Sequence, residues 1–323
     1  MTATALKAIE VFESTVYNVG KDLLNENVEI FNEHSNGAIV LSAQSIQGDF
    51  AQSLDVTLGK DLIKSRNPYI QQDLTDKHFS RTADNIVKLG MGLNPISWTN
   101  AEFNWVKQNP SLAGVKIGRA MAQQSMQRMA EFAIGSLATC LNGNAKIKHE
   151  VAKDSTISHI DFVQAISPMG DQFNSIDLYV IHSKTYFELV NTTFANAENL
   201  WDFGNFTVMR TALGHKFLIT DNKGLLKEDK QIYSLGLKKG SALVGTEQDF
   251  AQATVSITGK ENLGYRYQAE WTSALKIANR RYKTNTDLNG LTYAAVTTAA
   301  NWETISDDPK DETGVIIVKT IKE

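Results

Sequence analysis

One long helical pattern, NPSLAGVKIGRAMAQQSMQRMAEFAIGSLATCLNG, constrains this chain more than any other feature, and it runs from Asn109 to Gly143. Pro110 favours the first turn of a helix, and the pair Asn142-Gly143 supplies a residue able to take positive φ at its end. Small and apolar residues recur at three- and four-residue steps, which places them on one helical face: Val115, Gly118, Ala122, Met126, Met129, Ala133, Leu137 and Cys140.

A helix of this length, here called the spine helix, would be roughly 45 Å long at 1.5 Å per residue. That is longer than a compact domain usually needs, so we expect an elongated molecule. An ordinary core helix remains the alternative, because methionines and small residues at this spacing most often serve packing. The total length of 323 residues also favours two substructures or one elongated one.

The composition is that of a folded protein without disordered tracts, with 42% hydrophobic and 21% charged residues. A net charge of −4 argues against binding of nucleic acid by the whole surface. The single cysteine, Cys140, lies on the apolar stripe, so we expect a buried, inert thiol and no internal disulfide. The first twenty residues lack the pattern of a secretory signal, and no apolar run is long enough to span a membrane. We therefore expect folding in a reducing cytoplasm and no membrane partner.

Two segments before the spine helix predict contacts with other subunits. Residues 1–44 mix helical periodicity with polar stretches and contain few strongly apolar residues, so we expect an N-terminal arm that lies on a neighbour. Residues 45–98 are predicted to form two extended segments joined by a polar segment. Within the second extended segment, the two-residue period of a strand is shown by Val87, Leu89, Met91 and Leu93. An isolated two-stranded ribbon is marginal in water, so its tip should be exposed or docked on another subunit.

The remaining elements follow from local signals. Thr99 and Glu102 form a capping-box pattern, which predicts a short helix that ends before Asn109. A helix interrupted near Pro168 is followed by alternating strand and helix patterns, which predict a compact α/β unit. Its run SIDLYVIHS is nearly all apolar and predicts a strand covered on both faces. From Phe250 onward strands dominate, in ATVSITG, YRYQAEW and GVIIVKTI.

Motifs for catalysis or cofactor binding are missing from the sequence. The six histidines show no metal-pair spacing, and His182-Ser183 lacks the G-x-S-x-G pattern of a nucleophile elbow, so a structural turn fits better. The glycine-rich GLKKGSALVG lacks the G-K-[ST] ending of a phosphate loop, and a hairpin turn at Gly240 and Ser241 explains it better. We predict no catalytic, cofactor-binding or metal-ligating residues and no enzymatic activity.

Two charged clusters leave alternatives open. Asp307, Asp308, Asp311 and Glu312 could hold a calcium ion, although a solvated acidic turn fits better because EF-hand spacing is absent. The strongest local basic patch contains Arg280, Arg281 and Lys283. Contact with phosphate and surface salt bridges are equally plausible roles for it.

Several segments, in the expected order, resemble a tailed-bacteriophage major capsid protein of the Hong Kong 97-type fold. They are IFNEHSNGAIVLSAQSIQGDF, VKLGMGLNPISWTNAEFNW, MGDQFNSIDLYVIHSKTYFEL, ALGHKFLITD and IYSLGLKKGSALVG. The resemblance implies an α+β fold with a long spine helix, an extended β-hairpin loop, an N-terminal arm, and peripheral and axial domains. On this sequence these fall at 1–44 for the arm, 45–98 for the extended loop, 99–155 with 251–323 for the peripheral domain, and 156–250 for the axial domain.

The function implied by this resemblance is structural. Copies would form hexamers and pentamers that close into an icosahedral shell around packaged double-stranded DNA, contacted non-specifically, with scaffolding, portal and decoration proteins as possible further partners. The resemblance places subunit contacts on the arm and the extended loop, where the candidate interface residues are Phe31, Phe50, Lys60, Lys64, Arg66 and Tyr69. Some relatives cross-link neighbours through a Lys–Asn bond; Lys60 and Lys64 lie on the loop, but we expect no cross-link here.

Two other functions remain as alternatives. An encapsulin-like compartment shares the fold and encloses a cargo enzyme in place of a genome. A protein of another class, a cytosolic α/β enzyme without a recognisable motif, could use groups such as His182 and Asp221.

Overall fold

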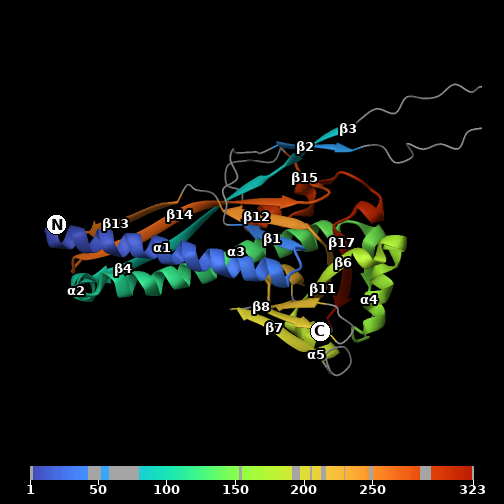
Figure 1. The fold of residues 1–323 in the computed structure, drawn as a ribbon, viewed down its shortest axis with the longest axis horizontal. Helices are drawn as coiled ribbons and strands as arrows, with labels where there is room; N and C mark the ends of the chain where they lie inside the picture. The colour runs from blue at the N-terminus through green and yellow to red at the C-terminus, as the bar shows by residue number, and fades with distance from the viewer. Residues whose placement is uncertain are drawn as a thin grey trace, which may run out of the picture.

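The computed structural model describes residues 3–42, 52–57, 80–152, 155–190, 197–203, 206–211, 216–228, 230–246, 250–283 and 292–321. The molecule is elongated, with a limb of long helices and strands at one end and a compact body at the other (Figure 1). The structure combines helices with sheets and is neither a helix bundle nor a β-barrel, which confirms the expected α+β class. None of the helices in the described ranges combines the length and apolarity needed to cross a membrane.

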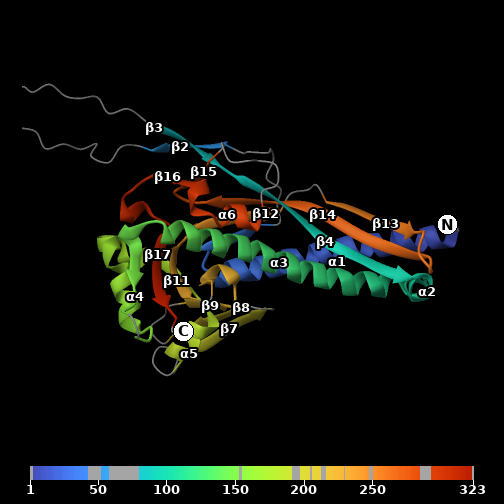
Figure 2. The ribbon, with the colours of Figure 1, turned by 180° about the vertical axis from the view of Figure 1, so that it is seen from behind.

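Two long helices that cross one another form the base of the limb (Figure 2). The spine helix is confirmed as α3 (Pro110–Asn142) and lies alongside α1 (Ala3–His34). Between them in sequence, α2 (Asn100–Gln108) starts with the expected capping box: the Thr99 N–H donates to Glu102 Oε2 at 2.8 Å, and the Glu102 N–H donates to Thr99 Oγ1 at 3.3 Å. One detail was wrong, because Gly143 ends α3 at φ −71° and not at positive φ.

The expectation that residues 1–44 lie on a neighbouring subunit was also wrong for the described part of that segment. Phe12 and Val16 of α1 are fully buried within their own chain. Glycines on α3 make this possible, because a Cβ at Gly118 would lie 2.9 Å from the Val16 carbonyl oxygen and one at Gly114 would lie 3.0 Å from that of Phe12. Helices that approach this closely bury backbone as well as side chains, so α1 packs tightly with few large apolar residues.

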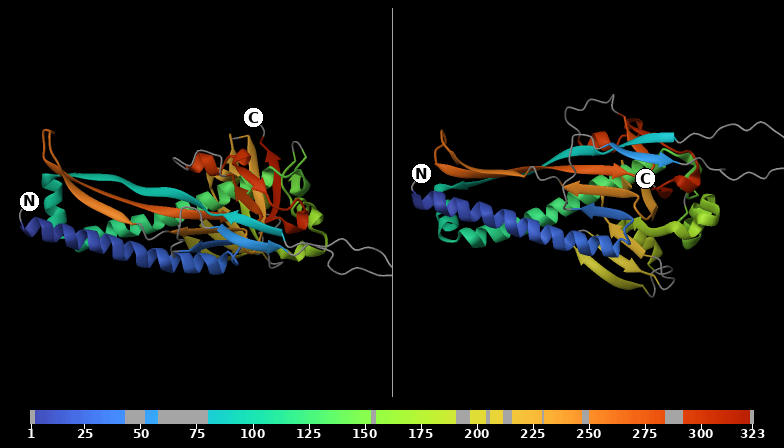
Figure 3. Two further views of the ribbon diagram at one scale, coloured as in Figure 1. Left: turned by 90° about the horizontal axis from the view of Figure 1, so that it is seen from above. Right: turned by 45° about the horizontal axis from the view of Figure 1, so that its top comes forward.

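A five-stranded sheet lies over the two helices of the limb (Figure 3). Its centre is β14 (Gly264–Ile277), which pairs on one side with β12 and β13 and on the other side with β4. The pairing with β4 has a bulge between Tyr267 and Ala269, and β1 completes the sheet by parallel pairing with β12. The other strands of this sheet are β1 (Ile39–Ser42), β4 (Val87–Thr99), β12 (Ala242–Thr246) and β13 (Ala251–Ile257).

An eight-stranded sheet forms the body, in the order β5-β17-β11-β6-β9-β8-β7 with β10 also paired to β11. Its bounds are β5 (Lys148–Glu150), β6 (Ile176–Ile181), β7 (Glu198–Phe203), β8 (Phe206–Arg210), β9 (Lys216–Thr220), β10 (Leu226–Lys227), β11 (Gln231–Lys238) and β17 (Gly314–Thr320). Helices α4 (His159–Ile166) and α5 (Ser183–Leu189) cover one face, where Phe162 packs edge-on against Tyr179. The end of α3 reaches the other face through Asn142 and Tyr233. The apolar run of β6 is therefore covered on both sides, as expected.

Smaller elements connect these layers. They are η1 (Ala145–Ile147), η2 (Ser167–Ser175) with its kink at Gly170, η3 (Lys223–Leu225), β15 (Arg280–Tyr282), α6 (Tyr293–Val296), η4 (Ala299–Asn301), β16 (Trp302–Thr304) and η5 (Pro309–Asp311). A separate antiparallel ribbon consists of β2 (Gln52–Thr57) and β3 (Ser80–Asn85).

Sheet membership differs from the expected domain boundaries in two places. The turn at Gly240 (φ 73°) does not close a hairpin, because β11 belongs to the body sheet and the next strand, β12, belongs to the limb sheet. Strand β17, expected with the peripheral strands of 251–323, lies between β5 and β11 in the body. Both differences arise from pairings between segments far apart in sequence, which local patterns do not encode.

Candidate subunit-contact surfaces

Of the six candidate interface residues, only Phe31 lies in the part of the chain that the structure describes. Phe50, Lys60, Lys64, Arg66 and Tyr69 lie outside the described residues. Phe31 is described, and its side chain has no exposed surface: it packs edge-on against Trp201 and Phe206 of the same chain. Phe31 therefore belongs to the core of the subunit, and its place among the interface residues was wrong. Its apolar character and its position near a turn gave no sign of this partner, which is 170 or more residues away in the chain.

The ribbon of β2 and β3 offers one surface for a neighbour. Gln52 lies opposite Asn85 and Thr57 lies opposite Ser80, so one edge of each strand is paired with the other strand. Among the described strands, neither pairs with any further strand. The ribbon continues the line of β4 and leads away from the limb (Figure 1), which leaves the outer edge of β2 without a sheet partner in the described structure.

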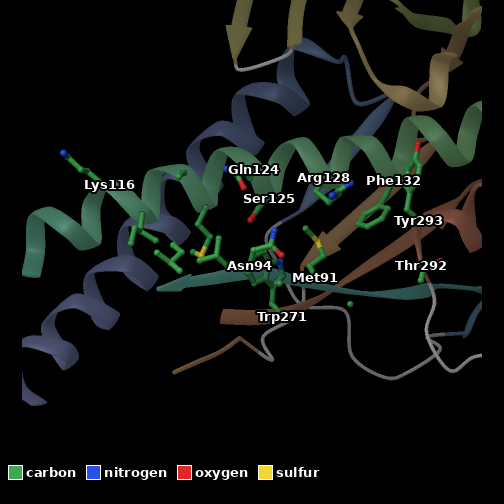
Figure 4. A pocket seen from close by; sticks show the side chains of 17 residues that line it. Met91, Asn94, Lys116, Gln124, Ser125, Arg128, Phe132, Trp271, Thr292 and Tyr293 are labelled. Carbon is green, nitrogen blue, oxygen red and sulfur yellow. The ribbon is translucent and has the colours of Figure 1, made fainter. Parts of the chain in front are cut away.

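A groove beside β4 is a second surface (Figure 4). It has a volume of about 710 Å³ and lies between α3 and the inner face of the limb sheet. Its walls are mainly apolar and come from Met91, Leu93, Ile117, Met121, Phe132 and Trp271. Polar side chains, including those of Asn94 and Gln124, also line it. Pockets of this size and composition are typical of sites that receive apolar groups.

The outer helices of the body carry a third surface. Ile160 and Val163 project from α4 and are 64% and 57% exposed, and Phe187 projects from α5 and is 70% exposed. The segment that leads into α4 is held to α5, because the Ile157 N–H donates to Glu188 Oε2 at 2.9 Å. Glu188 also forms an ion pair with Lys319 of β17. Large apolar side chains held outward on fixed helices are a common feature of protein–protein contact sites.

The basic patch predicted at residues 280–283 is divided by the structure. Arg280 is buried and forms an ion pair with Glu312 at 2.9 Å, and it also donates to the carbonyl oxygen of Cys140 at the end of α3. Arg281 forms an exposed ion pair with Glu303 at 2.6 Å. Of the two roles left open, salt bridging is therefore the one that the two arginines fill.

The acidic turn near residue 310 is also used internally. Glu312 accepts from Asn144 Nδ2 at 2.7 Å as well as from Arg280, and Asp308 accepts from the Lys310 N–H at 2.9 Å. No group of three or more potential metal ligands gathers anywhere in the described ranges. Glu312 therefore ties the turn to the end of α3, whereas Asp308 stabilises the turn itself.

The structure does bring His182 and Asp221 together, with 3.7 Å between His182 Nε2 and Asp221 Oδ1. Burial lowers the pKa of His182, and its Nδ1 accepts the Lys184 N–H at 3.2 Å at the start of α5. A neutral imidazole that caps a helix fills the structural role expected for this residue. Cys140 is buried as expected, and burial raises the pKa of its thiol to about 12.

Comparisons with known proteins give one match to a family. A family model described as Gp13-like, major capsid protein 13-like, matches residues 8–316. A search of curated protein sequences found no match.

Solved structures show distant likenesses. A chain from Mycobacterium phage Bobi is 12% identical with a TM-score of 0.47, covering 87% of this chain and 89% of that chain. The capsid of the cyanophage P-SCSP1u is 12% identical with a TM-score of 0.45, covering 75% and 84%. A virus-like particle from Pyrococcus furiosus is 10% identical with a TM-score of 0.42, covering 95% and 98%. With TM-scores below 0.5, these likenesses add nothing to the family match.

Proposed function

The chain belongs to the Gp13-like family of major capsid proteins, and from this premise we propose that its copies form hexamers and pentamers that close into the icosahedral head of a tailed double-stranded DNA bacteriophage. The observation that carries the proposal is the family match over residues 8–316, which includes both the limb and the body. Neither the encapsulin-like compartment nor the cytosolic enzyme is favoured by that match.

The form of the subunit supports assembly from many copies. It is elongated, and it carries a projecting ribbon, an open apolar groove and outward apolar side chains on α4 and α5. Rings close by rotation when one surface of a subunit meets a different surface of the next subunit. Many modest contacts of this kind add up to a stable shell. We assign the limb to the peripheral domain and the body to the axial domain.

Packaged DNA would be contacted without sequence preference. The subunit is mildly acidic overall, with a net charge of −4, and the exposed face of the second half of α1 carries Asp22, Glu26, Glu29 and Glu33. An inner wall that held phosphates tightly would obstruct filling and release of the genome. A strongly positive inner surface in an assembled shell would contradict this part of the proposal.

Further partners follow from the same proposal. Scaffolding, portal and decoration proteins would bind the growing or completed shell, assembly would take place in the host cytoplasm, and the finished protein would reside in the virion. We expect no covalent cross-link between subunits. Boiling shells in SDS should therefore release a single monomer band, and a ladder of larger bands would refute that expectation.

The direct experiment is expression of the protein, alone and together with its neighbouring genes, followed by negative-stain electron microscopy. Closed shells of uniform size are the expected result. Shells that contain a protein cargo and no DNA would favour the encapsulin-like alternative. Monodisperse monomers or dimers on a sizing column under every condition would contradict a shell protein of either kind.

A further inference from the structure

We propose that the polar contacts of Asn36 with Asp177 and Lys216, here called the elbow clamp, fix the angle between the limb and the body, and that this angle sets the curvature with which copies close into a shell. The inference rests on the proposed function and assigns the size of the shell to a contact inside each subunit. The end of α1, the buried attachments beside it and the length of the limb support it.

The elbow clamp joins the end of α1 to two strands of the body sheet. Asn36 lies just after α1; its Nδ2 donates to Asp177 Oδ1 at 3.2 Å, and its Oδ1 accepts from Lys216 Nζ at 3.3 Å. Lys216 Nζ also donates to the carbonyl oxygen of Glu33, in the last turn of α1, at 3.4 Å. Asp177 belongs to β6 and Lys216 to β9, and these strands are paired in parallel. One amide side chain and one helix carbonyl therefore connect α1 to both strands.

The backbone around Asn36 is fixed by hydrogen bonds. Asn36 has φ 58°, a left-handed conformation that asparagine adopts more readily than most residues. Its N–H donates to the Glu33 carbonyl oxygen at 3.2 Å, and the Gly37 carbonyl oxygen accepts from the Gly240 N–H at 2.7 Å. Gly240 lies in the turn where the chain passes from β11 of the body to β12 of the limb. A shift of Asn36 on the body sheet therefore carries the end of α1 with it.

Buried attachments hold the limb to the body independently of the elbow clamp. Phe31 of α1 is fully buried and packs against Trp201 and Phe206 of the body sheet. The end of α3 is held by the buried ion pair between Arg280 and Glu312. Two such attachments still allow rotation about the line that joins them, and the elbow clamp restrains this rotation. Its contacts are exposed, and exposed polar contacts contribute little to stability, so the restraint can be lost while the fold is kept.

The length of the limb amplifies a small change of angle. α1 has 32 residues, so it is roughly 48 Å long at 1.5 Å per residue, and it reaches far from the body (Figure 3). A rotation of about 5° at the body end would move the far end by roughly 4 Å over a helix of that length. Every copy repeats the same angle, and small contributions add up over many linked copies. One weak contact in each subunit can therefore select one shell size.

The first test removes the side chain of Asn36 and leaves its backbone conformation in place. Glycine takes positive φ without strain, so Asn36→Gly should keep the turn and melt within about 3 °C of the wild type. Its shells should spread over several diameters in electron micrographs, whereas wild-type shells should have one diameter. Lys216→Met removes the other side of the contact and keeps an apolar stem, and it should give the same result.

Each variant has a matched control. Glu228→Gly also places glycine at a position with positive φ, in an exposed turn of the body. Arg210→Met changes the residue opposite Lys216 in the sheet, where the guanidinium forms an exposed ion pair with Glu198 of β7. Both controls should form shells of one diameter.

Spin labels measure the angle directly in unassembled subunits. Ser14 on the limb part of α1 and Lys227 on the body are both exposed, and the native Cys140 is buried and so protected from labelling. Labels attached to Ser14→Cys and Lys227→Cys should give a broader distribution of distances when Asn36→Gly is added than in the otherwise wild-type chain.

The outcomes separate this inference from the proposed function. Shells of one diameter from Asn36→Gly or from Lys216→Met, or equal widths of the two distance distributions, would overturn the inference and leave the proposed function intact. The same spread of diameters from either control would also overturn it, as would the loss of all shells from a folded Asn36→Gly subunit. Failure of the wild type and of both controls to form shells would overturn both.

Discussion

The sheets of the body and the limb are covered to different degrees. In the body, β11 is buried along nearly its whole length, between α4 and α5 on one face and the end of α3 on the other. In the limb, the outer half of β14 alternates between buried and exposed residues, because only its inner face meets α1 and α3. Buried apolar area is the main stabilising contribution in folding. The difference shows that the body sheet is packed on both faces, whereas the outer half of the limb sheet is packed on one face alone.

The largest effect should come from breaking the ion pair that joins the body to the end of α3. Glu312→Ala would leave Arg280 buried without a counter-charge, and the side chains of these residues are 0% and 2% exposed. Removing one partner of such a pair costs about 3–5 kcal/mol, so the urea midpoint should fall sharply.

Glu303→Ala provides the control, because Glu303 forms an exposed pair with the adjacent Arg281. Exposed ion pairs contribute little to stability, so its urea midpoint should stay close to that of the wild type. If both variants lowered the urea midpoint equally, the burial of the Arg280–Glu312 pair would not explain its contribution to stability.

A smaller effect is expected in the limb, at the close contact between α1 and α3. Gly118→Leu would force the helices apart, since even a Cβ at this position would lie 3.1 Å from the Gly20 nitrogen as well as close to Val16. Overpacking of this kind costs about 1–3 kcal/mol. Limited proteolysis should then cut α1 while the body stays intact.

Gly143→Ala is the matched glycine control. Gly143 has φ −71°, and the nearest atom to a built Cβ is 3.5 Å away. Alanine fits there and should leave stability unchanged or raise it by about 0.4–1 kcal/mol. A Gly118→Leu variant as protease-resistant as Gly143→Ala would show that α1 does not depend on this contact.

A third prediction concerns acid stability of the body's outer layer. Burial would raise the pKa of Asp161, but hydrogen bonds from Ser158 and from His149 outweigh it and lower the pKa. A carboxylate with a lowered pKa stabilises the fold above its ordinary pKa, and this contribution is lost as the pH falls through the lowered value. Asp161→Asn should therefore cost about 1 kcal/mol at neutral pH, as for a lost helix cap, and should flatten the acid limb of stability against pH.

Thermal unfolding between pH 2 and pH 7 measures this effect. The wild-type and Asp161→Asn curves should converge at the acid end. If they stay parallel over the whole range, the carboxylate does not contribute in the way described.

The smallest effect involves no loss of stability. Burial raises the pKa of the Cys140 thiol to about 12, so the thiol should stay protonated and unreactive toward a disulfide reagent at pH 8. One equivalent should react once the protein is unfolded in urea. Rapid labelling of the folded subunit would show that the end of α3, where limb and body meet, opens far more easily than its packing implies.

Local signals in the sequence were sufficient for the elements but not for their partners. The spine helix, the capping box at Thr99 and the doubly covered strand β6 each depend on periodicity or on residues a few positions apart, and all three predictions were confirmed. The docking of α1 depends on glycines about a hundred residues away that permit close approach. Nothing near Phe12 or Val16 in the sequence shows that such a surface exists.

The candidate contact surfaces show the same limit. Arg280 and Arg281 are adjacent residues of the same type, and the sequence does not distinguish their roles. In the structure Arg280 is buried and Arg281 is exposed, because only Arg280 faces the end of α3. The groove beside β4 was not predicted at all. Its walls come from β4, α3 and β14, and no local sequence pattern shows that these three elements meet.

The position of β17 between β5 and β11 has a consequence for how the protein is made. Synthesis proceeds from the N-terminus, so β5 and β11 leave the ribosome well before the strand that joins them. Until residues 314–320 emerge, the body sheet of a nascent chain is incomplete. The surfaces of two such unfinished chains would not fit each other well. A subunit can therefore complete its body sheet only after residues 314–320 have been synthesised.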